Sequence, residues 1–448
     1  MVFDPAGEIL WQGYDEEKRA ALRSAGMASV PSLTALLDPG VLSGCDRGEI
    51  LDVAERLGFI SRRGAPKGML TALPQATLLD QCMDAFNSAH LEALHANRID
   101  FPLIFDRSEH DLMELTQSYE DQDRMFRLAG KDADLRLVYA ADPSLFAWLR
   151  RTRLDARKLP YTIYTPLPVF RRWLSGEISL ERMRQYPVPD VHVLCEPASA
   201  MMTFADVVKH ASVNARFWVA EDLALSLEIV DQAAGDPYAL ARQFARAAGC
   251  YTVLKVLPSR PRYYSVKGGL MIYAGYGLLM LYNFQLDDTN GRRFQICLDD
   301  ARAVTIIHAT IAGGWPKMLP LMLGRGLTGV GPRFIPPELA MHQVICLPVA
   351  DRHSPLAQAT ADRLAGAGVR AVAEAASGSL GARLHRLRQR WQPLRAVIGD
   401  REDGDEAVIE SADGKLALPL AKFIADCRDR FERCRPLSRF QPNDPPFI

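Results

Sequence analysis

The chain has 448 residues, of which 48 % are hydrophobic and 24 % are charged, a composition typical of a globular protein with two or three domains. The formal net charge of −1 excludes a global positive field for nucleic acid, but it leaves room for a local basic face. Eight scattered cysteines without a Cys-x-x-Cys pair argue against a disulfide framework and favour reduced thiols in a cytoplasm. The N-terminus has no apolar core of the signal-peptide type, and no segment predicts a membrane span.

The first hundred residues predict helices that are joined by turns. Residues 1–45 predict a small N-terminal extension with a short helix near Glu16–Ser24. A helical stretch begins at Asp46, and a longer helix is predicted over Leu73–Ala96 because its apolar residues fall on one face. FPLIF, at residues 101–105, predicts a short apolar strand.

The middle of the chain predicts strands of a largely antiparallel sheet, with residues 203–246 helical. The strands are expected at LRLVYA (135–140), TIYTPLPVF (162–170), VHVLCEP (191–197), YTVLKVL (251–257), LMIYAGYG (270–277), LMLYNFQL (279–286) and RFQICL (293–298). The apolar stretch Gly268–Leu286 predicts two buried strands around a turn, and residues 305–323 predict a strand that passes into a helix. This alternation lacks regular βα units and therefore favours an α+β fold over a Rossmann sheet.

A linker is predicted at Pro336–Pro337, and after it the pattern changes. Strand and helix now alternate, which predicts a compact α/β domain at residues 338–435, with a final helix at 417–433. Residues 436–448 form a Pro-rich tail.

The segments of this last domain resemble the anticodon-binding domain of threonyl-, prolyl-, histidyl- and glycyl-tRNA synthetases. AGVRA, LGARL and VIGDRE come in the order of that family. Upstream, the motifs of threonyl-tRNA synthetase are matched in order by GAPKGML, LTQSYEDQDRMF, LPYTIYTPLPVFRRWLSG, RMRQYPVPDVHVLC, YYSVKGG, YNFQLDD and VTIIHATIAGGWPKM. The resemblance runs from Asp46 to Asp429, and no segment resembles the editing domain of the family. It implies a class II synthetase-like antiparallel-sheet catalytic domain at residues 46–337, an anticodon-binding-like α/β domain and a homodimer.

In that family a cysteine and two histidines hold a zinc ion that selects the amino acid. The matching positions here are Asp142, His192 and His308. One carboxylate and two imidazoles with open positions can bind Zn catalytically or Fe(II) as a facial triad. The alternative is that both histidines are held by hydrogen bonds in the core and that Asp142 caps a turn before Pro143.

The nucleotide side of the family site is partly altered. The resemblance gives Arg171 and Lys267 catalytic positions, with Arg171 and Arg182 on the phosphates of ATP with Mg. However, Trp173 stands where the family has a glutamate, and Lys317 where it has the arginine that lies on the nucleotide. We therefore expect ATP binding to be impaired. The arginines can equally be read as solvated surface charge.

The amino-acid side is better kept. Asp190 lies at the position of the carboxylate that holds the substrate ammonium, and Tyr264, Tyr186 and Gln285 lie at pocket positions. Val188 departs from the family, which has a glutamine there. The pocket is expected to take a small amino-acid-like substrate, unless the two tyrosines are only core aromatics.

Recognition of standard tRNA is not expected. The family's Arg–Asn–Glu–Lys run is replaced by Ala376–Ser379, which cannot make charged or bidentate contacts to bases. Three functions are consistent with these substitutions. The protein activates a small amino acid with ATP and transfers it to a non-tRNA acceptor; or it is a Zn- or Fe-dependent enzyme that does not adenylate; or it is a non-catalytic amino-acid sensor or synthetase regulator.

Overall fold

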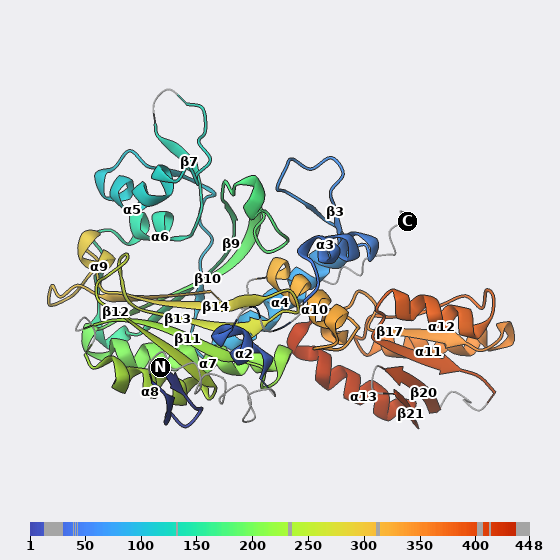
Figure 1. Ribbon diagram of the computed structural model, residues 1–448. Helices are drawn as coiled ribbons and strands as arrows, with labels where there is room; N and C mark the ends of the chain where they lie inside the picture. The colour runs from blue at the N-terminus through green and yellow to red at the C-terminus, as the bar shows by residue number, and fades with distance from the viewer. Residues whose placement is uncertain are drawn as a thin grey trace. The chain divides into compact units, whose positions relative to one another are not determined.

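The computed structural model describes residues 1–12, 30–38, 40, 42, 44–130, 133–231, 235–310, 314–400, 406–411 and 414–435 (Figure 1). The chain divides into two compact units, which are described separately. The first unit comprises Met1–Gly44, Lys67–Met69 and His90–Met318; the second comprises Cys45–Pro66, Leu70–Ala89 and Leu319–Ile448. No helix within the described residues is both long enough and apolar enough to cross a membrane. The predicted helix near Glu16–Ser24 and the Pro-rich tail lie outside these residues.

The first unit is built on a sheet of ten described strands. From one edge to the other they are β2 (Ile9–Trp11), β1 (Val2–Phe3), β12 (Tyr251–Leu257), β11 (Ala224–Val230), β13 (Tyr264–Tyr273), β14 (Leu278–Asp287), β16 (Thr305–Thr310), β10 (Gln185–Cys195), β9 (Tyr161–Phe170) and β5 (Asn97–Arg98). Only the pairs β11–β12 and β5–β9 are parallel among these. The predicted antiparallel sheet is therefore confirmed. The predicted turn within Gly268–Leu286 is also confirmed, since it joins β13 to β14 through Gly275 and Gly277, both at positive φ.

Helices cover the two faces of this sheet differently. α7 (Ala200–Val219) and α8 (Pro237–Ala248) pack together on one face, where Phe204 of α7 contacts Phe284 of β14 with ring centroids 6.2 Å apart. Figure 1 shows α5 (His110–Asp121) and α6 (Asp142–Leu149) on the other side of the sheet. α6 is anchored by Leu145, Phe146 and Leu149, which are buried against the sheet and the segment that precedes β16.

Four sequence predictions in this unit are corrected by the structure. Residues 135–137 (β7) pair with β6 (Ile104–Asp106) in a separate two-stranded sheet. The predicted helix 203–246 is interrupted by β11, a central strand that shows no simple alternation because it is largely buried on both faces. In RFQICL only β15 (Cys297–Leu298) is a strand, since a short helix, α9 (Asn290–Arg293), precedes it. The strand predicted at residues 101–105 begins at Ile104 instead.

The second unit contains a five-stranded sheet and its helices. The strand order is β18 (Ala371–Ala373), β17 (Val344–Pro348), β19 (Leu394–Ile398), β20 (Glu406–Ser411) and β21 (Gly414–Pro419). The first three strands are parallel, and the last two are antiparallel. The helices that follow in chain order include α11 (Ser354–Gly366), α12 (Leu380–Gln389) and α13 (Leu420–Phe431). The predicted final helix at 417–433 begins only at Leu420, because the residues before it pair with β20 as β21.

Candidate metal and substrate site

Two rows of polar side chains cross the centre of the first unit's sheet. Partner residues on neighbouring strands share a face, and so do residues two positions apart along a strand. Both rows therefore lie on the face opposite Phe284, away from α7. The first row is Gln285, His308 and His192, and the second row is Asn283, Thr310 and Asp190, in each case on β14, β16 and β10.

Asp142, in the first turn of α6, meets the two histidines of the first row. Its Oδ1 lies 2.9 Å from Nδ1 of His308 and 3.7 Å from Nε2 of His192. One ligand atom from each residue lies within 4.8 Å of the other two. Donors bound to one ion at about 2.0–2.2 Å lie roughly 3–3.5 Å apart, so a small inward shift lets this Asp/His/His cluster hold one ion.

His308 is oriented by a second carboxylate. Its Nε2 lies 3.1 Å from Oδ2 of the buried Asp287, which also accepts backbone N–H bonds from Thr289 and Asn290, both at 2.9 Å. Burial lowers the pKa of His308, but the hydrogen bonds and charges of Asp142 and Asp287 raise it to about 10. A histidine that binds a metal usually has such a partner on its other nitrogen. Asp287 was not found from sequence; its signal is the first aspartate of YNFQLDD, at the end of β14.

His192 has unsatisfied ring nitrogens. The residue is 0 % exposed, and neither nitrogen forms a hydrogen bond within the described part of the chain. The 3.7 Å separation from Asp142 is too long for a hydrogen bond. Buried polar groups are nearly always satisfied, so an orphaned imidazole beside a carboxylate fits a metal ligand better than a core histidine. The partner expected for its second nitrogen is not found among the described residues.

A large cavity of about 620 Å³ opens over both rows. Asp142, Asp190, Asn283 and Thr310 line it. Oδ1 of Asn283 and Oγ1 of Thr310 are buried without a hydrogen bond to a described residue, and the same is true of Thr165, the β9 neighbour of Asp190. Burial raises the pKa of Asp190, and the nearby Asp142 charge adds to this effect. These groups are hydrogen-bond acceptors, so together they suit an ammonium group.

The aromatic residues of the cavity differ from those expected. Tyr263 lines the large cavity, and its hydroxyl donates to Oε1 of Gln285 at 2.6 Å. Tyr264 lies instead beneath Lys267, whose Nζ is 5.9 Å from the ring centroid and 3.9 Å from Glu228. Tyr186 lies beneath a guanidinium group, and neither it nor Tyr264 lines a described part of the large cavity.

The groups expected on the nucleotide side lie in different surroundings. Arg171 lines the large cavity and donates from Nε to the carbonyl oxygen of Tyr139 at 2.9 Å. The guanidinium of Arg182 lies over the ring of Trp173, 5.7 Å from its centroid. Nζ of Lys317 donates to a backbone carbonyl of β14 at 2.9 Å, and burial lowers its pKa to about 8. Of these three charged residues, Arg171 is the one that lines the large cavity.

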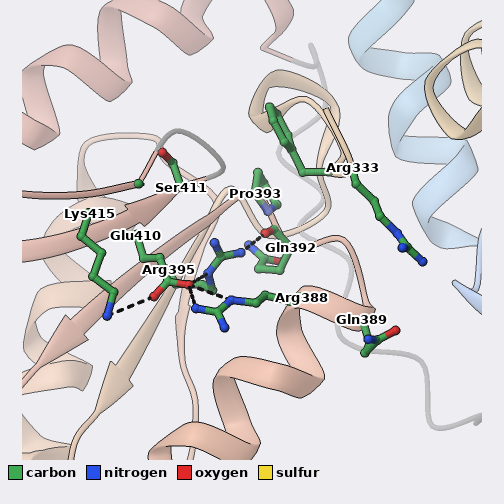
Figure 2. A pocket seen from close by; sticks show the side chains of 11 residues that line it. Arg333, Arg388, Gln389, Gln392, Pro393, Arg395, Glu410, Ser411 and Lys415 are labelled. Atoms are coloured by element: carbon green, nitrogen blue, oxygen red, sulfur yellow. Dashed lines mark hydrogen bonds and ion pairs between the residues drawn. The ribbon is translucent and has the colours of Figure 1, made fainter. Parts of the chain in front are cut away.

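A separate cavity of about 500 Å³ lies in the second unit. Figure 2 shows the cations Arg388, Arg395 and Lys415 converging on Glu410, which is 3 % exposed. Two nitrogens of Arg388 lie 3.0 and 2.6 Å from Oε1 of Glu410, and Nε of Arg395 lies 3.2 Å away. Sequence reasoning missed this Glu410 pocket. Its signal is cross-strand pairing, since Arg395 of β19 is the register partner of Glu410 of β20.

Known proteins resemble both units. Residues 343–427 match the family described as "Anticodon binding domain". The chain is 24 % identical to the threonine–tRNA ligase of Methanoregula boonei over 75 % of this chain and 55 % of that protein. It is 23 % identical to the threonine–tRNA ligase of Staphylothermus marinus over 90 % of this chain and 66 % of that protein. The chain therefore spans about half to two thirds of the length of these relatives.

Solved structures agree in fold. The RNA binding domain of threonyl-tRNA synthetase from Cryptosporidium parvum has a TM-score of 0.71 at 17 % identity, covering 85 % of this chain and 97 % of that chain. Prolyl-tRNA synthetase of Giardia lamblia, solved with prolyl-adenylate, has a TM-score of 0.67 at 14 % identity, covering 88 % and 82 %. The predicted fold is confirmed: a class II aminoacyl-tRNA synthetase-like catalytic domain with a large mixed sheet is followed by an anticodon-binding α/β domain.

Proposed function

Starting from this similarity to threonine–tRNA ligases, we propose that the protein acts on a small amino-acid-like substrate through a divalent metal, Zn or Fe(II), held by Asp142, His192 and His308. The observation that carries the proposal is the orphaned His192 beside a carboxylate and a second imidazole. Three protein ligands leave coordination positions open, as in catalytic metal sites. When bound, the metal supplies Lewis acidity to a substrate donor atom.

Other residues of the site would bind the substrate and orient the metal ligands. Asp190 and the acceptors of the second row, Asn283 and Thr310, receive the substrate ammonium group. Asp287 fixes the ring of His308, so its Nδ1 is presented to the metal. The hydroxyl of Tyr263 is already bonded to Gln285, which supports a role for both in shaping the cavity wall.

Metal analysis of the purified protein tests this proposal. We expect one equivalent of Zn or Fe in the wild type and its loss in His192→Ala and His308→Ala. Asp142→Cys restores the residue type of the family, so we expect it to keep Zn and to lose affinity for Fe(II). His353, a buried histidine of the second unit, is the matched control: His353→Ala should keep the metal. Unchanged metal content in folded His192→Ala and His308→Ala proteins would end the proposal.

ATP-dependent activation of the substrate, followed by transfer to a non-tRNA acceptor, is a second candidate function. It is favoured by Arg171, which lines the large cavity. It is disfavoured by Lys317, which is bonded to β14, and by Trp173, which is covered by arginine. ATP–pyrophosphate exchange over a panel of amino acids separates the two functions. Exchange that is lost in Arg171→Ala would establish activation, whereas no exchange in a metal-loaded protein supports chemistry without adenylation.

Charging of standard tRNA is not part of the proposal. The segment Ala376–Ser379 carries no charged side chain, and the hydroxyl of Ser379 is used to cap α12 by accepting from the N–H of Ala382 at 3.2 Å. We expect no aminoacylation of tRNA(Thr). Charging at a rate near that of a threonine–tRNA ligase would contradict this expectation.

A further inference from the structure

A second, smaller cavity of about 190 Å³ adjoins the large cavity. The two cavities share Ser118, Tyr119, Arg171 and Arg262. No carboxylate lines the described wall of the small cavity. Its lining residues are Ser118, Tyr119, Gln122, Arg124, Arg171, Trp173 and Arg262. Asp142 and Asp190 thus line the large cavity, whereas arginines without a carboxylate line the adjoining small cavity.

Three donor groups of the small cavity have no hydrogen-bond or ion-pair partner among the described residues. Nε of Arg171 is bonded to Tyr139, but its two Nη groups form no hydrogen bond or ion pair with a described residue. Arg262 lies over the ring of Tyr119 at 5.9 Å and likewise has no ion-pair partner in the described ranges. Nε1 of Trp173 is buried and unbonded in the same part of the chain. A buried indole N–H normally has an acceptor, so this unbonded donor indicates a site for a ligand atom.

The surroundings of Trp173 hold its ring in place. The guanidinium groups of Arg124 and Arg182 lie 5.2 and 5.7 Å from its ring centroid. Arg124 is itself paired with Glu177, with Nη2 2.9 Å from Oε1, so its charge is already compensated. Of the three arginines that line the small cavity, Arg171 and Arg262 are therefore the ones without an ion-pair partner in the described ranges. Two guanidinium groups and one N–H donor form a site for a compact anion with several acceptor oxygens.

We propose that the ligand of this site is an amino compound that carries a phosphate monoester, with the phosphate bound by Arg171, Arg262 and Nε1 of Trp173. This inference rests on the proposed function, because Asp190 and the metal cluster receive the amino end of the same ligand. A dianionic phosphate suits two guanidinium groups and one indole N–H better than a neutral group does, because it offers negative charge and several acceptor oxygens. At about 190 Å³ the small cavity lies below the roughly 300–1,000 Å³ range of ordinary ligand pockets, so its size suits a phosphate group better than a nucleoside.

Calorimetric titration with inorganic phosphate, O-phospho-L-serine, L-serine and ATP tests the inference. We expect saturable binding of inorganic phosphate and tighter binding of O-phospho-L-serine than of L-serine. Arg262→Ala and Trp173→Phe should each weaken phosphate binding about tenfold, the effect of one lost charged hydrogen bond. Phenylalanine at position 173 keeps an aromatic ring but lacks the N–H donor. Arg157→Ala is the control, because Arg157 is paired with Asp155 at 2.9 Å, lines neither cavity and should change nothing.

Two results would overturn the inference. One is phosphate binding that is absent, or that is unchanged in both Arg262→Ala and Trp173→Phe. The other is an effect of these variants on ATP alone, which would assign the phosphate to a nucleotide. Removal of metal with a chelator separates this inference from the proposed function. It should weaken L-serine binding and leave the effect of Arg262→Ala on inorganic phosphate intact, whereas L-serine binding that is independent of metal would defeat the proposed function alone.

Discussion

Two buried carboxylates, one in each unit, have opposite surroundings. Glu410 of the second unit is 3 % exposed and Asp190 of the first unit is 8 % exposed. Glu410 is enclosed by cations that come from its own sheet and from α12 (Figure 2). The side-chain carboxylate of Asp190 forms no hydrogen bond or ion pair with any residue in the described ranges. Burial is therefore similar, but only Glu410 is neutralised by the fold itself.

The pKa values of these carboxyl groups shift in opposite directions for this reason. Burial opposes ionisation of Glu410, but the hydrogen bond from Arg388 and the charges of the other cations hold its pKa below the usual range. Burial raises the pKa of Asp190, where no cation is close enough to reverse the effect. A buried charge that is compensated internally stabilises the fold, whereas one left uncompensated is available to a ligand.

The largest expected effect tests the structural side of this comparison. Glu410→Ala leaves Arg395 buried without its carboxylate, so the free energy of unfolding should fall by about 3–5 kcal/mol. Urea denaturation measures this change. Glu406→Ala, on an exposed position of the same strand, is the control and should have little effect. A loss below about 1 kcal/mol for Glu410→Ala would mean that the Glu410 pocket is not a stabilising network.

The next effect concerns the partner of the metal cluster. Asp287→Asn removes the charge that orients His308, and we expect a 10- to 100-fold loss of metal affinity. Competition with a chromogenic chelator measures it. Asp300→Asn, whose carboxylate pairs with the exposed Arg302 at 2.6 Å, should leave the affinity unchanged. Equal affinities for Asp287→Asn and wild type would show that the 3.1 Å contact does not tune the site.

A smaller effect of opposite sign is expected for Asp190. Because its carboxylate is buried and uncompensated, Asp190→Asn should raise the free energy of unfolding by about 1 kcal/mol at pH 7 while it abolishes substrate binding. The pKa of Asp190 is raised in the folded state. Its carboxyl group therefore does not lower the free energy of unfolding below the pKa of the unfolded state, about 3.9, but it does so as pH rises through the folded-state pKa. The gain should therefore vanish at low pH. Denaturation at two pH values tests this, and a destabilised variant at pH 7 would break the comparison.

The smallest effect is expected at the exposed Asp400 of the second unit. Arg352 and His353 hydrogen-bond to its carboxylate and lower its pKa to about 2. The contribution of Asp400 to the free energy of unfolding is present above the pKa of the unfolded state and is lost as pH falls towards 2. Asp400→Asn should therefore flatten the acid dependence of stability between about pH 4 and pH 2 without affecting metal binding. An acid profile that is identical to that of the wild type would show that this surface cluster contributes nothing.

Local patterns predicted most elements of the fold. The hairpin of β13 and β14 follows from its apolar runs and glycines, and α11 and α12 follow from their periodicity. β11 was missed because a buried central strand lacks alternation, and β21 was missed because its pairing with β20 is set across a turn.

The site was predictable only where the resemblance supplied positions. It gave Asp142, His192 and His308, which are distant in the sequence and meet only because β10, β16 and α6 come together. Asp287, Arg262 and Glu410 could not be found in this way. The roles of these three residues depend on strand register, on burial and on whether a partner is within reach. Local sequence patterns predict none of these.

The ring of Phe146 has a further consequence for the lifetime of the bound ion. It stands edge-on to both imidazoles, 6.5 Å from His192 and 6.0 Å from His308, as part of the buried anchor of α6. The apolar ring offers no ligand atom to an ion, whereas Asp142 and His308 line the large cavity, so we expect a bound ion to leave through that cavity. A ligand bound in the large cavity should block this route and slow the release of the ion, even if the ligand contributes little to the equilibrium affinity for the metal. Stopped-flow transfer of the metal to a chelator, with and without L-serine, would measure this kinetic trapping, and equal rates would refute it.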